Sequence, residues 1–148
     1  MGCFHGFISV TVGAAPGDSL NDRKYAPIIA RLLLAAIFIV FSLNFWLHFI
    51  PMPPSPPPDS PVGMFMGALF PTGYLAAVKV LELTGGLLVA SGRFTAAGLL
   101  ILGPIILNIL FFDIFLAHAF NPVSTLAAVL ALFLLWTKRE PFLAFLKA

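Results

Sequence analysis

"GYLAAVKVLELTGGLLVASGRF", residues 73–94, is long and apolar enough to cross a bilayer, yet it contains Lys79 and Glu82. A single charged side chain at the centre of a bilayer costs about 2.5–3.5 kcal/mol on insertion scales. Two side chains three residues apart lie on one face of a helix, so these opposite charges can neutralise each other. We therefore expect the pair to face the interior of a helical bundle rather than lipid.

The composition of the whole chain is typical of an integral membrane protein. Of its 148 residues, 60% are hydrophobic and only 9% are charged, whereas a typical soluble domain is about 25% charged. The net charge of +2, without a run of lysine or arginine, argues against nucleic acid as a partner. The single cysteine, Cys3, excludes an internal disulfide and any metal site built from cysteines.

Four apolar segments account for most of the chain. They cover about residues 27–50, 74–92, 94–118 and 122–137. The first three approach or exceed the roughly 20 residues that a membrane-spanning helix needs, and the fourth is short but begins at a favourable Asn-Pro pair. Because only a tight turn at Ser91, Gly92 and Arg93 joins the second and third segments, those two must form an antiparallel hairpin. The sequence thus predicts an all-α fold, a four-helix transmembrane bundle.

The segments outside these helices differ in composition. Residues 1–24 are predicted to be a flexible cytoplasmic tail, although the start "MGC" leaves N-terminal lipidation open. Residues 25–148 are predicted to form the transmembrane domain. Its outer connection begins with a Pro-rich loop, "PMPPSPPPDSP" (51–61), which is typical of a stiff spacer. Residues 62–70 then predict a short re-entrant or interfacial helix across the outer mouth of the bundle, and a similar short helix is expected near the C-terminus, in "FLAFLKA".

Basic residues in the short connections predict the orientation of the chain. They precede the first segment, separate the second from the third, and follow the fourth: Arg23, Lys24, Arg93, Lys138, Arg139 and Lys147. The connections on the other side contain neither lysine nor arginine. By the positive-inside rule, we expect both termini in the cytoplasm and the protein in the bacterial cytoplasmic membrane.

This topology places most intramembrane polar side chains in the outer half of the bundle. Asn44 and His48 lie one turn apart on the first segment, and Asn108 lies on the third segment at a similar depth. With Lys79 and Glu82 they form a predicted polar cluster and a candidate ligand-binding site. The cluster is either a functional pocket or a set of contacts that fixes helix register.

Two charged residues, Asp113 and Arg31, are predicted to lie apart from this cluster. Asp113 is about 140° around its helix from Asn108, at 100° per residue, so we expect it to face the outer headgroups or a partner. Arg31 is expected to extend to the cytoplasmic headgroups. His48 and His118 lie near outer helix ends, where they offer another interpretation, as axial ligands to haem or chlorophyll. No other metal site is predicted.

Three blocks of sequence together suggest a family. They are "RLLLAAIFIVFSLNFW" (31–46), "MGALFPTGYLAAVKVLELTGGLLVASGRF" (66–94) and "GPIILNILFFDIFL" (103–116). Their order resembles the DoxX family of small four-helix membrane proteins, over roughly residues 27–137. The resemblance implies a membrane subunit associated with a quinone-reducing or quinol-oxidising enzyme. It carries over no catalytic set residue by residue.

Two functions follow as hypotheses. The first is an integral accessory subunit of a larger respiratory or photosynthetic electron-transfer complex, in contact with membrane lipids and other integral subunits. The alternative is a quinone-interacting redox component, in which Lys79 or His48 donates a hydrogen bond to a ring carbonyl and Glu82 relays protons. Because the chain shows no electron carrier, we expect it not to be catalytic on its own. A small transporter is a weaker hypothesis, since four helices provide no inverted repeat of adequate size.

Overall fold

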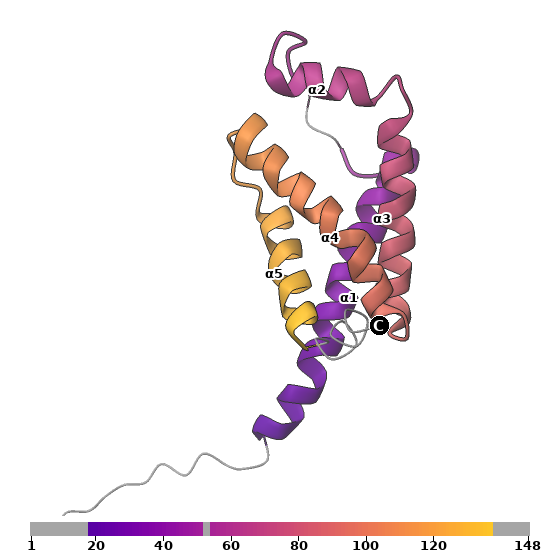
Figure 1. Cartoon of the computed structure of the whole chain (residues 1–148), viewed down its shortest axis with the longest axis vertical. Coiled ribbons are helices and arrows are strands. Elements are labelled where there is room, and N and C mark those ends of the chain that lie inside the picture. Colours follow the sequence, from indigo (N-terminus) through magenta and orange to yellow (C-terminus); the bar gives the residue numbers. More distant parts are fainter. Residues whose placement is uncertain (1–17, 52–53, 138–148) are drawn as a thin grey trace, which may run out of the picture.

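The computed structural model describes residues 18–51 and 54–137, and all regular structure in these ranges is helical (Figure 1). The elements are α1 (Asp18–Leu47), α2 (Pro61–Leu69), α3 (Tyr74–Ser91), α4 (Thr95–Phe111), the π-helical turn η1 (Phe112–Leu116) and α5 (Pro122–Thr137). Three stretches are long and apolar enough to cross a membrane: Tyr25–Leu47, Tyr74–Ser91 and Thr95–Leu116. The α5 helix is apolar but shorter. The predicted all-α class is thus confirmed for the described residues, and the three apolar helices indicate a membrane protein.

The first helix differs most from its predicted boundaries. It begins at Asp18 rather than at residue 27 and ends at Leu47 rather than at residue 50. The prediction took the helix from the apolar stretch that begins at Pro27, but this proline lies inside α1. Residues 18–24, which the sequence analysis assigns to the N-terminal tail, are therefore helical. Residues 1–17 and the short helix expected near the C-terminus lie outside the described residues.

The predicted antiparallel hairpin is formed by α3 and α4 (Figure 1). It turns at Gly92, whose φ of 73° lies in the left-handed region that glycine adopts readily. The two helices then pack closely at Gly98 of α4. A Cβ atom there would lie 2.8 Å from the carbonyl oxygen of Gly85 and 2.9 Å from the amide nitrogen of Val89. Only glycine fits at this position, because two of these close atoms belong to the α3 backbone, which cannot move aside as a flexible side chain can.

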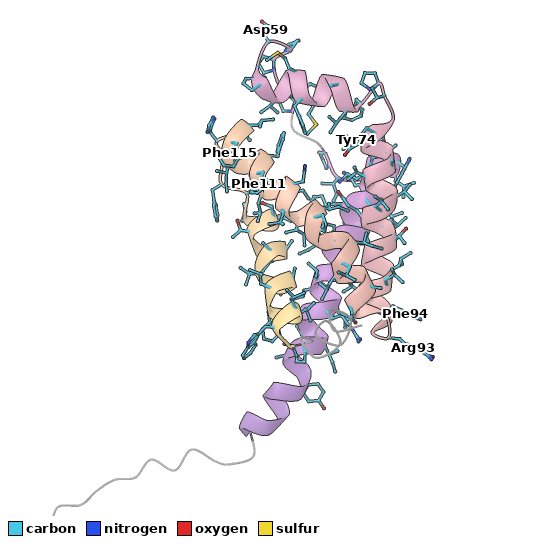
Figure 2. All side chains as sticks on the ribbon, in the orientation of Figure 1. Asp59, Tyr74, Arg93, Phe94, Phe111 and Phe115 are labelled. Carbon is cyan, nitrogen blue, oxygen red and sulfur yellow. The ribbon has the colours of Figure 1, made fainter. Side chains whose placement is uncertain are left out.

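The core is assembled from four helices. Its most deeply buried apolar side chains come from α1, α3, α4 and α5: Leu34, Val89, Leu102 and Leu134. The α1 helix packs against α3 and α5, and α4 also packs against α5. Large apolar side chains on the opposite faces are exposed, among them Phe94, Phe111 and Phe115 (Figure 2). Such an apolar surface is expected of helices in contact with lipid or with other helices.

The α2 helix lies across the end of the molecule at which α3 begins (Figure 1). The helix predicted for residues 62–70 is therefore confirmed as a helix, one residue earlier than expected. Ser60 caps its N-terminus, since the Gly63 N–H donates to Ser60 Oγ at 3.0 Å, and Pro61 occupies the first helical position. These two local signals start the helix immediately after the Pro-rich loop.

Few contacts attach α2 to the rest of the molecule. None of its residues is buried. The Phe65 ring lies 5.7 Å from the Phe112 ring of η1, measured between centroids. Just beyond the helix, Phe70 lies 5.8 Å from Phe45 of α1. The α2 helix thus covers the end of the molecule and leaves space beneath it.

Candidate functional site

A cavity of about 1240 Å³ lies between α2 and the helices α1, α3, α4 and α5. Most of the residues that line it are apolar, and its polar lining residues include Tyr74, Lys79, Glu82, Asn108, Asp113 and Ser124. Ligand sites for small molecules are typically apolar clefts of about 300–1,000 Å³ with a few polar groups that orient the ligand. The cavity has this character and is somewhat larger.

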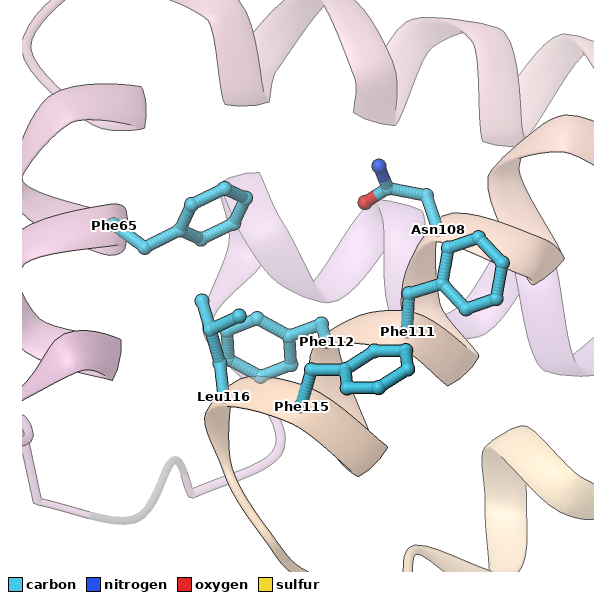
Figure 3. Close-up of a pocket in the computed structure, with 6 residues that line it drawn as sticks. All are labelled: Phe65, Asn108, Phe111, Phe112, Phe115 and Leu116. Atoms are coloured by element: carbon cyan, nitrogen blue, oxygen red, sulfur yellow. The ribbon is translucent and has the colours of Figure 1, made fainter.

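A smaller pocket of about 140 Å³ adjoins the cavity, between α2 and the end of α4 with η1. It shares three lining residues with the cavity: Phe65, Asn108 and Phe112. Figure 3 shows the Phe65 and Phe112 rings and the Asn108 amide around this pocket. The two spaces meet where α2 approaches the end of α4.

The Lys79–Glu82 pair lies on the α3 wall of the cavity. Lys79 Nζ donates to Glu82 Oε2 at 2.7 Å. The Glu82 residue is only 3% exposed, and the Lys79 side chain is 21% exposed. From α1, Ser42 Oγ donates to the same Glu82 oxygen at 3.3 Å. The prediction that this pair faces the interior is therefore confirmed, and Ser42 is a third member that the sequence analysis missed.

Of the other predicted cluster residues, only Asn108 lines the cavity. Asn44 is buried elsewhere and ties down the chain that follows α1: the Ile50 N–H donates to Asn44 Oδ1 at 2.6 Å, and Asn44 Nδ2 donates to the Ile50 carbonyl at 3.4 Å. His48 is exposed, and its Nδ1 lies 3.2 Å from the Trp46 carbonyl. The prediction that Asn44 and His48 join the cluster is wrong. It assumed a helix as far as residue 50, whereas α1 ends at Leu47.

The two histidines proposed as axial ligands both follow helix ends. His48 and His118 have φ values of 50° and 47°, and both side chains are exposed. Neither lines the cavity. Within residues 18–51 and 54–137, no three side chains of the metal-binding types are grouped so as to hold a metal ion. An axial-ligand role would therefore concern positions outside this cavity.

A second polar pair joins η1 to α5. Asp113 and Ser124 are each only 8% exposed, both line the cavity, and Ser124 Oγ donates to Asp113 Oδ2. The expectation that Asp113 faces the headgroups or a partner is wrong, because α5 folds back against α4 and covers that side of the helix (Figure 1). The sequence did contain one sign that Asp113 belongs to the site: it is an ionisable residue inside an apolar segment, and such residues are often functional. Its π-helical setting is another frequent feature of functional sites.

Arg31 lies outside the cavity, at the other end of the hairpin. Its guanidinium lies against Gly92 in the α3–α4 turn. The Arg31 Nε atom is enclosed and has no hydrogen-bond partner among the described residues. A cation at the C-terminus of α3 is favourably placed relative to the helix dipole. The side chain thus extends towards the end of the molecule that carries the α3–α4 turn.

Comparison with protein-family models, curated proteins and solved structures gave no match to this chain. The resemblance to the DoxX family therefore remains a hypothesis. The function has to be argued from the cavity and from the groups that line it.

Proposed function

We propose that this chain is an integral membrane protein that binds a quinone-type molecule in the cavity beneath α2. The observation that carries the proposal is the Lys79–Glu82 pair in the wall of an otherwise largely apolar cavity of about 1240 Å³. A quinone has apolar ring faces and an apolar tail, which match such a lining. Its carbonyl oxygens accept hydrogen bonds, so binding requires donors at the wall.

Two side chains supply donors for those carbonyl oxygens. An ammonium group has three hydrogens to donate, and Lys79 uses one of them on Glu82. Asn108 lines the cavity as an exposed side chain and contributes the two N–H donors of its amide. Glu82 compensates the Lys79 charge, which would otherwise be costly to bury. The pair thus places a positively charged hydrogen-bond donor in an apolar cavity, and Glu82 offsets the free energy that burial of this charge costs.

Reduction or oxidation of a bound quinone would require an electron carrier from another protein, because the residues of this cavity transfer no electrons by themselves. We therefore propose that the chain acts beside other integral subunits of a membrane electron-transfer complex. This is the quinone-interacting role that the resemblance to the DoxX family implies.

A second candidate is an accessory subunit without a ligand, in a respiratory or photosynthetic complex. The observation that favours it is the exposed apolar surface on all four long helices, which includes Leu33, Leu87, Leu107 and Leu132. Such faces suit lipids or partner helices. The quinone-binding role is preferred because a subunit that only packs against others has no need of an ion pair inside a cavity.

The proposal includes the placement of the chain in the bacterial cytoplasmic membrane. The helices α1, α3, α4 and α5 would form a four-helix transmembrane bundle, with α2 as a re-entrant or interfacial helix on the outer side. The start of α1, the Arg93 turn and the end of α5 lie towards one end of the molecule (Figure 1). Since the predicted basic connections lie at that end, this arrangement supports cytoplasmic termini. The 16 residues of α5 span only about 24 Å, which a local thinning of the bilayer accommodates.

The proposal is tested by binding of a short-chain quinone to the full-length protein purified in mild detergent. Lipid extracts of the native protein are examined for quinone, and its co-purifying partners are identified by mass spectrometry. An absorbance spectrum of the same sample tests for haem or chlorophyll. The decisive variant is the double substitution Lys79→Met and Glu82→Leu, which removes both charges together.

We expect the native protein to bind quinone and the double variant to bind at least about tenfold more weakly, which corresponds to about 1.4 kcal/mol. Thr84→Val is the matched control, because Thr84 is an exposed residue of the same helix, does not line the cavity, and bonds only to the Val80 carbonyl. A native protein that binds neither a quinone nor its hydroquinone, or a double variant that binds them equally well, would contradict the proposal. Stoichiometric partners without bound quinone would support the second candidate instead.

A further inference from the structure

Each carboxylate in the cavity has one oxygen that makes no hydrogen bond to a described residue. Glu82 accepts both of its hydrogen bonds at Oε2, from Lys79 and from Ser42. Asp113 accepts its hydrogen bond at Oδ2, from Ser124. No described residue donates to Glu82 Oε1 or to Asp113 Oδ1. Neither atom is sealed from its surroundings, because Arg31 Nε is the only enclosed and unpartnered side-chain atom among the described residues.

These two oxygens are available to a ligand in the cavity. Glu82 and Asp113 are 3% and 8% exposed, and both line the cavity, on α3 and on η1 respectively. A carboxylate oxygen accepts hydrogen bonds and does not donate them. Leaving such an acceptor without a donor in an apolar site is unfavourable. The cavity therefore calls for a ligand that brings donors of its own to two positions.

The oxidised and reduced forms of a quinone ring differ in this property. The carbonyl oxygens of the quinone can only accept hydrogen bonds. A carbonyl oxygen beside a carboxylate oxygen would therefore be a contact between two acceptors, with no hydrogen to share. The hydroxyl groups of the hydroquinone can donate to the carboxylates, and their oxygens can still accept from Lys79 or Asn108. The same wall thus offers the reduced ring more hydrogen bonds than the oxidised ring.

We infer that the cavity binds a hydroquinone in preference to the corresponding quinone, with the ring hydroxyls donating to Glu82 Oε1 and Asp113 Oδ1. The inference rests on the proposed function, since it concerns the ligand of the same cavity. It adds the redox form that the site selects and gives Asp113 a role as a specificity-determining residue. It involves binding alone and requires no oxidant or reductant.

The test compares three ligands that share one ring and one short tail: the hydroquinone, the quinone and the dimethyl ether of the hydroquinone. The ether lacks both O–H donors and resembles the hydroquinone in shape. Binding to the full-length protein in detergent is measured without oxygen, so that the hydroquinone stays reduced. We expect the hydroquinone to bind about ten- to a hundredfold more tightly than the other two, because hydrogen bonds to charged groups are among the stronger ones.

Asp113→Asn tests the residue itself. Asparagine keeps the size of the side chain and an acceptor for Ser124, but it places an amide on the same carbon in place of the second acceptor oxygen. We expect this variant to bind the hydroquinone more weakly and the quinone no more weakly, so that the preference falls about tenfold. Asp59→Asn is the matched control, because Asp59 is an exposed acidic residue in the outer loop and does not line the cavity.

The outcomes separate this inference from the proposed function. Equal binding of the hydroquinone and its dimethyl ether would overturn the inference, and so would tighter binding of the quinone, while either result leaves a ligand in the cavity. No binding of any of the three would overturn the inference together with the proposed function. If Asp113→Asn does not fold, the comparison of ligands on the unaltered protein decides the question.

Discussion

At the scale of residues, the surroundings of the Lys79–Glu82 ion pair on α3 are set by other helices, and not by the spacing of the two residues alone. Lys79 and Glu82 meet within one helix, but Ser42 reaches the same carboxylate from α1. Asn44 is as deeply buried as Glu82 and has a different role, since it forms hydrogen bonds with the backbone of Ile50 after α1 ends. Residues that look alike in an apolar segment thus divide into a structural amide and a cavity carboxylate.

The pair itself yields a prediction about stability. Lys79→Met alone should lower the free energy of unfolding by about 3–5 kcal/mol, because it leaves the Glu82 carboxylate buried without a counter-charge. The double variant Lys79→Met and Glu82→Leu should recover most of this loss, since neither charge is then buried. Thermal unfolding in detergent, followed by circular dichroism, measures both changes. A single variant as stable as the native protein would show that the pair contributes nothing to folding.

At the scale of elements, close backbone contact between α3 and α4 sets the shape of the hairpin. Gly85 and Gly98 let the two helices approach until the backbone atoms nearly touch. The η1 turn then ends the apolar stretch of α4, and the short connection that follows brings α5 alongside. The cavity exists because α4 diverges from α3 with distance from their turn (Figure 1). The α2 helix covers the open end of this space and contacts few residues of the other helices.

Gly98→Ala should destabilise the protein by about 1–3 kcal/mol, since its new methyl group would collide with the α3 backbone. Gly103→Ala is the matched control on the same helix, because no atom lies within 4 Å of the position that its Cβ would take. Alanine there should be neutral or should stabilise α4 by about 0.5–1 kcal/mol. The same unfolding measurement compares the two variants. Equal effects would mean that the helices are not in close contact at Gly98.

At the scale of the whole molecule, the structure has two different ends. Asp59 and Arg93 lie at opposite ends (Figure 2). The end with α2 carries the Pro-rich loop and covers the cavity, and the other end carries the hairpin turn. If the basic end is cytoplasmic, the cavity lies in the outer half of the membrane, where a membrane-soluble ligand can reach it from the outer leaflet.

This orientation can be measured in whole cells with a thiol reagent that does not cross membranes. The single native cysteine is first removed by Cys3→Ser, and then Asp59→Cys or Arg93→Cys is introduced alone. We expect the Asp59→Cys variant to be labelled in intact cells. The Arg93→Cys variant should be labelled only after the membrane is opened. The reverse pattern would place the termini outside and the cavity on the cytoplasmic side.

Much of the fold was predictable because the relevant signals are local. Apolar length, the three-residue connection at Gly92 and the Asn-Pro start of the last helix indicate helices and a hairpin without knowledge of any distant contact. The inward orientation of Lys79 and Glu82 follows in the same way, since two charges on one helix face cannot both be left in hydrocarbon. These properties depend on neighbours within one or two helical turns.

The composition of the site was not predictable to the same extent, because it depends on contacts between distant parts of the chain. Ser42 and Glu82 are 40 positions apart, and Ser124 reaches Asp113 from the next helix. A single serine in an apolar segment carries no pattern that names its partner. The end of α1 at Leu47 removed Asn44 and His48 from the predicted cluster, and the return of α5 brought Asp113 into the cavity. Where a helix ends, and how a later helix packs back against it, depends on contacts between elements. The members of the cavity wall could therefore be assigned only from the folded chain.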